Sequence, residues 1–124
     1  MQPTKTFRSD NRGTTAIEFA ILAPVFISLI IGTLYLCNLL FLVGSLHFAV
    51  EDGARCASVK TTVCTDNASI IAYAQSRFLG PFVSPTFTYA AAACGNSVSA
   101  TANYVFDMGV SQVTVPISAT ACFP

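Results

Sequence analysis

The longest feature of the hydropathy pattern is an apolar run close to the N-terminus. Residues 19–43 include no charged side chain and only a few polar ones. As a helix, these 25 residues would measure about 38 Å, which exceeds the hydrocarbon core of a bilayer, roughly 30 Å thick. The pattern therefore predicts a membrane-spanning helix that begins near Thr14 or Thr15, whose hydroxyls can cap it. Pro24 removes one backbone donor inside the run and predicts a kink there.

The helical pattern continues beyond the apolar run, with a change of character. Residues 45–59 place apolar side chains at helical spacings of four, four and three on one face, namely Leu46, Val50, Ala54 and Ala57. Glu51 and Arg55 stand four residues apart on a neighbouring face, in the favourable order. We therefore expect one helix from about residue 14 to residue 60, of which residues 45–60 form an amphipathic continuation.

A second, shorter helix is expected over residues 65–81. Thr65 or Asp66 can cap its N-terminus, and Gly80-Pro81 closes it. One face of this helix is apolar and is lined by Ile70, Ala74 and Phe78.

The pattern changes to strands after Pro85. Apolar and polar residues alternate over three segments, 86–94, 102–108 and 110–118. Turn residues at 95–97 and 107–109 separate them, and the second turn favours a hairpin of the last two strands. Pro116 restricts the last strand to a sheet edge or a bulge. The predicted fold class is α+β: a long N-terminal membrane-spanning helix that extends into a small head with one further helix and a small antiparallel sheet.

The distribution of charge predicts the orientation of the chain in the membrane. The chain has 124 residues, 53% apolar and 10% charged, with a net charge of zero, so it offers no electrostatic footprint for nucleic acid. Basic residues precede the apolar run (Lys5, Arg8 and Arg12), and the first charges after it are Glu51 and Asp52. The positive-inside rule then predicts a cytoplasmic N-terminus. We expect a leader at 1–13, the transmembrane helix at 14–44 and an exported head at 45–124.

Cysteine usage agrees with an exported head. Cys37 lies in the apolar run, and the other four cysteines lie beyond it, where disulfides can form: Cys56, Cys64, Cys94 and Cys122. Three pairings are possible. We favour Cys56–Cys64 with Cys94–Cys122, because each pair is nearest in sequence. Chain entropy gives stabilisations of roughly 2.5 and 3.5 kcal/mol for the two loops. Zinc is the competing interpretation, but the spacing lacks a C-x2-4-C pair, so no metal site is expected.

Candidate catalytic chemistry is sparse. His47 is the only histidine, and it stands just after the apolar run without a second ligand or a base–nucleophile set. Asp66, Asp107 and the Glu51-Asp52 pair are most simply caps, turns and a solvated face. We expect no catalytic residue and no cofactor, hence no enzyme. A cleaved secretory signal is also disfavoured, because the apolar run is too long and ends without an A-x-A site.

Glu18, at the mouth of the apolar run, belongs to a motif. The segment "RGTTAIEFA" resembles the processing motif of type IV pilin-like proteins of the tight-adherence (Tad/Flp) branch. In that motif a glycine ends the leader, which places the scissile bond at Gly13–Thr14 and makes Glu18, followed by Phe19, the fifth mature residue. The segment "EDGARCASV" (51–59) is similar to the stretch that follows the membrane helix in TadE-like pseudopilins.

The resemblance implies a function in pilus assembly. It implies a minor pilin or pseudopilin that a prepilin peptidase cuts after Gly13, and that takes part in assembly of a Tad-type (type IVb) pilus for cell adhesion. Its expected partners are that peptidase, other pilin subunits, the inner-membrane assembly platform and the lipid bilayer. The chain would sit in the bacterial inner membrane with its head in the periplasm, and would enter a surface pilus. Glu18 of one subunit would pair with the new Thr14 ammonium of a neighbour and set their register.

A second hypothesis comes from a different class of protein. The same chain can be an unprocessed, single-pass binding module that displays a disulfide-stabilised periplasmic head. The N-terminus of the membrane form separates the two hypotheses, because only the first requires a chain that begins at Thr14.

Overall fold

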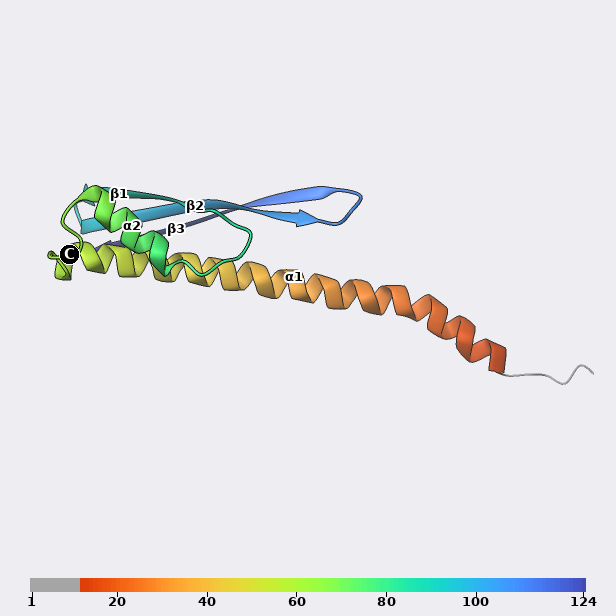
Figure 1. Ribbon diagram of the computed structural model, residues 1–124. Helices are drawn as coiled ribbons and strands as arrows, with labels where there is room; N and C mark the ends of the chain where they lie inside the picture. The colour runs from red at the N-terminus through yellow and green to blue at the C-terminus, as the bar shows by residue number, and fades with distance from the viewer. Residues whose placement is uncertain (1–11) are drawn as a thin grey trace, which may run out of the picture. The chain divides into compact units, whose positions relative to one another are not determined.

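The computed structural model describes residues 12–124 and confirms the α+β class (Figure 1). Most of the expected leader at 1–13 lies outside the described residues. The elements in chain order are α1 (Arg12–Val59), α2 (Asn67–Arg77), β1 (Thr86–Ala92), β2 (Gly95–Asp107) and β3 (Gln112–Phe123). The chain divides into two compact units, one that ends at Leu34 and a head that spans Tyr35–Pro124.

The first unit is the N-terminal part of α1. This helix is long and apolar enough to cross a membrane, and its large apolar side chains up to Leu34 are exposed. The hydroxyls of Ser28 and Thr33 donate to backbone carbonyls of the preceding turn, at 2.8 Å each, so the helix itself provides their hydrogen bonds. Helical structure continues through Pro24, and the expected kink at that residue stays a prediction.

The head begins on the same helix. From Tyr35 onward one stripe of α1 becomes buried, and Leu42 and Leu46 are completely or almost completely enclosed. The expected stripe is confirmed, since Val50 and Ala54 are buried and Ala57 packs against the core. The apolar run is therefore longer than a bilayer requires because its last residues are core residues of the head.

Helix α2 has the expected cap at its N-terminus. Asp66 is the N-cap and accepts a 2.8 Å hydrogen bond from the Ser69 backbone N–H, while its own N–H donates to the Ser69 hydroxyl at 3.0 Å. The hydrogen bonds with Ser69 lower the pKa of the Asp66 carboxyl. Ile70 and Ala74 form the buried face. The helix ends at Arg77, earlier than expected, because Phe78 already has extended backbone angles.

The two helices approach each other closely at a small-residue contact. A Cβ placed on Gly53 of α1 would lie 2.9 Å from the Ala74 Cβ of α2. Glycine at position 53 is therefore what allows α2 to lie directly on α1.

The sheet is antiparallel, with the order β1-β2-β3. The buried side chains of β2 alternate along the strand, as expected for a sheet with one covered face, and are Val98, Ala100, Ala102 and Tyr104. β1 pairs with only the first part of β2, up to Thr101, whereas β3 pairs with β2 along almost its whole length. The far part of the β2–β3 hairpin is therefore two-stranded. Pro116 lies on β3, an edge strand, as expected.

The start of β2 differs from the expectation. Residues 95–97 were expected to form a turn, but Gly95 already pairs with Ala92, and the turn consists of Ala93 and Cys94. Gly95 has a φ of +122°, and a Cβ there would meet the Phe123 carbonyl. The positive φ and the close approach to β3 both require glycine at this position.

Both favoured disulfides are present. Cys56–Cys64 joins the end of α1 to the segment before α2, and Cys94–Cys122 joins the β1–β2 turn to the end of β3. The Cα atoms are 5.9 Å and 6.2 Å apart, within the usual range. Cys37 is free and exposed.

Candidate functional site

The residues of the processing motif lie on the first turns of α1. Gly13, Thr14, Glu18 and Phe19 are all exposed, and a Cβ on Gly13 would have no heavy atom within 4 Å. Thr14 and Glu18 are four residues apart, so they lie one turn apart on the same face of the helix. The structure thus presents both groups on one accessible surface. Their roles in cleavage and register stay predictions.

The sequence analysis missed a polar network that joins α2 to α1. The Tyr73 hydroxyl donates to Asp52 Oδ2 at 3.1 Å and accepts from Lys60 Nζ at 2.9 Å and from Arg77 Nη2 at 2.8 Å. Arg77 Nε also forms an ion pair with Asp52 Oδ2 at 3.0 Å. The bond to Tyr73 and the nearby Asp52 carboxylate raise the pKa of Arg77. One phenol therefore connects three charged side chains.

The sequence indicated one contact of this network, the one between Tyr73 and Arg77. Tyr73 and Arg77 are four residues apart on α2, and the Arg77 guanidinium lies 4.8 Å from the Tyr73 ring centroid. Asp52 was interpreted as part of a solvated face because nothing local marks its partner. The expected pairing of Glu51 with Arg55 is not among the ion pairs of residues 12–124, and both side chains are exposed.

We expect Tyr73→Phe to lower the free energy of unfolding of the head by about 1–2 kcal/mol, because Asp52 and both cations lose a shared partner. The measurement is thermal or urea unfolding followed by circular dichroism. Tyr104→Phe is the matched control: within the described chain its hydroxyl makes no hydrogen bond, so its removal should change stability little. Equal effects of the two variants would contradict a stabilising role for the network.

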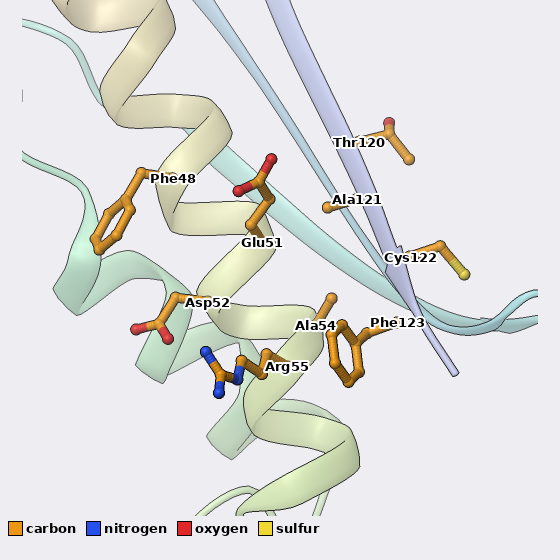
Figure 2. Close-up of a pocket in the computed structure, with 9 residues that line it drawn as sticks. All are labelled: Phe48, Glu51, Asp52, Ala54, Arg55, Thr120, Ala121, Cys122 and Phe123. Carbon is orange, nitrogen blue, oxygen red and sulfur yellow. The ribbon is translucent and has the colours of Figure 1, made fainter.

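A shallow groove of about 540 Å³ separates α1 from the outer edge of β3 (Figure 2). Figure 2 shows Glu51 turned toward β3, whereas Asp52 points to the opposite side of α1. The strand side of the groove consists of residues 120–123. The outer edge of β3 has no partner strand in the described sheet. An edge strand of this kind can accept a further strand from another chain.

The remaining candidates do not come together. His47 is exposed on α1, and no three His, Cys, Asp or Glu side chains within residues 12–124 are placed to hold a metal ion. Asp66 and Asp107 act locally, as a helix cap and in the β2–β3 turn. The Gly109 N–H, as the larger cause, and the Gln112 amide donate to Asp107 and lower the pKa of its carboxyl.

Fold and surface together define the class: an α+β head carried on one apolar N-terminal helix that is long enough to cross a membrane. Residues 13–55 match the family model described as TadE-like protein, so this segment is similar to TadE-like, pilin-related proteins. The resemblance noted in the sequence is confirmed. TadE-like proteins are pilus-associated structural proteins and are not a known enzyme family. No curated protein and no solved structure matches the chain.

Proposed function

We propose that this chain is a minor pilin or pseudopilin that takes part in assembly of a Tad-type pilus for adhesion. The observation that carries the proposal is the extent of the family match. It begins at Gly13, where the motif places the end of the leader, and it ends at Arg55, inside the head. The match therefore covers the processing motif, the apolar helix and the start of its amphipathic continuation.

The proposed location is the bacterial inner membrane, with the N-terminus in the cytoplasm and the head in the periplasm. Basic residues precede the apolar helix, which favours a cytoplasmic N-terminus. Both disulfides lie after the apolar run at 19–43, and structural disulfides are typical of an oxidising compartment. These two observations are independent and support the same orientation.

The proposed mechanism starts with cleavage by a prepilin peptidase after Gly13. Cleavage creates an ammonium at Thr14, and the Glu18 carboxylate of one subunit then pairs with the Thr14 ammonium of a neighbour. In a water-poor bundle of helices an unpaired carboxylate is strongly disfavoured, so the pair selects one axial register. The exposed apolar side chains around it, such as Phe19 and Leu22, contact lipid first and neighbouring subunits after assembly.

We expect Gly13→Leu to block removal of the leader when the chain is co-expressed with the peptidase. A Cβ at position 13 meets no heavy atom within 4 Å, so the substitution leaves the fold intact and acts on peptidase recognition. Gly32→Leu is the matched control, since position 32 is equally open and lies further along the same helix. Intact-mass spectrometry should show a chain that starts at Thr14 for the wild type and for Gly32→Leu, and an uncut chain for Gly13→Leu.

The same spectra test the alternative of an unprocessed binding module. The groove beside β3 gives that alternative a possible binding surface. A wild-type chain that keeps Met1 in the presence of the peptidase would favour the binding module and refute the processing step. A start near Ser45 would refute both, because it would mean that the apolar helix is removed as a signal.

A further inference from the structure

The tip of the β2–β3 hairpin carries apolar side chains that the head does not bury. The hairpin tip, residues 107–112, includes Met108 and Val110, which are 59% and 98% exposed. The Asp107 carboxylate is satisfied locally, because it accepts hydrogen bonds from the Gly109 N–H at 2.8 Å and from Gln112 Nε2 at 3.1 Å. The tip is thus an apolar projection whose one charged group already has partners.

The position of this tip along α1 is fixed by Tyr35. The Tyr35 hydroxyl donates to the backbone carbonyl of Asp107 at 3.2 Å, and its ring lies 5.5 Å from that of Phe106. In Figure 1 the far end of the β2–β3 hairpin reaches well beyond α2, which lies in the same unit. The hairpin tip is therefore the part of the head that lies at the level of Tyr35.

Tyr35 stands where the membrane is expected to end. About twenty helical residues cross a hydrocarbon core, and a span that starts after Glu18 ends near Asn38. The large apolar side chains before Tyr35 are exposed, whereas Leu39 and Leu42 already pack in the head. Tyrosine is itself enriched at the boundary between lipid and water.

We propose that the hairpin tip contacts the lipid bilayer, with Met108 and Val110 at the boundary between headgroups and acyl chains. Two side chains form too small a patch for a stable contact with a second protein, which buries about 1,000 Å² or more. A bilayer has no such requirement, because single apolar side chains next to an existing anchor partition into its interface. Together with α1, the tip gives the head a second point of support and a defined orientation above the membrane.

The proposal rests on the proposed membrane anchoring, and one experiment can test the two separately. The chain has no tryptophan, so single substitutions give an unambiguous fluorescent probe. We expect Val110→Trp, in the full chain reconstituted into phosphatidylcholine vesicles, to emit at shorter wavelength than free tryptophan. Brominated acyl chains should quench it several-fold more strongly than aqueous iodide does. Because Val110 is almost fully exposed, the substitution leaves the fold undisturbed.

Two control variants define the outcomes. Phe26→Trp lies in the apolar part of α1 and reports on anchoring alone. Val63→Trp replaces an apolar residue that is 56% exposed and lies just after the end of α1, which is about 36 Å from Tyr35 along the helix, and it should be quenched by iodide only. Lack of bromolipid quenching at Phe26→Trp would refute the anchoring. Quenching there, together with a Val110→Trp signal like that of Val63→Trp, would refute the contact of the tip. A blue-shifted Val110→Trp that neither quencher reaches would mean that protein covers the tip, and would also overturn the proposal.

Discussion

Glu18→Gln is expected to leave removal of the leader intact and to exclude the subunit almost completely from filaments. Glutamine keeps the size and the hydrogen-bonding capacity of the side chain but not its charge. The Thr14 ammonium of the neighbouring subunit then remains unpaired in a water-poor bundle. Loss of one partner of a buried ion pair costs about 3–5 kcal/mol, which corresponds to more than about a hundredfold in an association constant. Incorporation can be measured as the ratio of variant to wild type in sheared pili.

Glu51→Gln is the matched control, since Glu51 is the only other glutamate and lies exposed on the same helix. It should be incorporated like the wild type. A sharper comparison uses association of the membrane form, followed by energy transfer between labelled subunits. Glu18→Gln should weaken association of the cleaved chain and have no effect on the uncut chain, which lacks the ammonium. Equal effects in both forms would show that Glu18 acts without Thr14, and normal piliation would refute the register role.

Much of the fold could be predicted because its signals are local. The long helix follows from apolar periodicity, α2 from its cap at Asp66, and the β2–β3 hairpin from alternation around a turn. The disulfide pairing followed from sequence proximity, which is informative when only four cysteines lie beyond the apolar run. For the candidate site, Gly13 and Glu18 were recognised by a continuous motif, and the structure adds that the motif lies on an accessible helical surface.

The parts that could not be predicted depend on contacts between segments far apart in sequence. Glycine is typical of turns, and only the pairing of Gly95 with Ala92 shows that it begins a strand. The Asp52–Tyr73 contact joins two helices, and neither helix alone indicates it. At the end of the long apolar run, the sequence does not distinguish side chains that face lipid from side chains that pack in the head. The β2–β3 hairpin, which packs near Tyr35, shows where burial in the head begins.

The double variant Cys94→Ser/Cys122→Ser is expected to lower the free energy of unfolding of the head by about 3.5 kcal/mol. The disulfide closes a long loop, with a sequence separation of 28, so its loss returns much conformational entropy to the unfolded chain. For a domain of this size the midpoint of thermal unfolding should fall by roughly 15–25 °C. Such a loss is a large part of the total stability of an ordinary domain.

The position of the Cys94–Cys122 disulfide allows its removal without a packing defect in the core. Cys94 is exposed and Cys122 partly so, whereas Cys56 and Cys64 are buried, and replacing them would add a packing defect to the entropic effect. Hydrogen bonds hold the same end of the sheet independently: Ser58 donates to the Phe123 carbonyl at 3.1 Å, and Asn96 donates to Ser58 at 2.8 Å. The folded state should therefore survive, and the change should fall mainly on the unfolded state.

Cys37→Ser is the matched control for that double variant, because it makes the same substitution at a free, exposed cysteine. It should leave the midpoint unchanged, and it also provides a background in which Cys37 cannot exchange with the remaining disulfide. Unfolding is followed by circular dichroism without reductant. In the Cys37→Ser background, a decrease in the free energy of unfolding below about 1 kcal/mol would contradict the chain-entropy argument. It would mean that the hydrogen bonds of Ser58 and Asn96 already order this end of the sheet in the unfolded ensemble. A loss near the expected value would show that the small head depends on the cross-link between the β1–β2 turn and the end of β3, as a domain with so limited a core should.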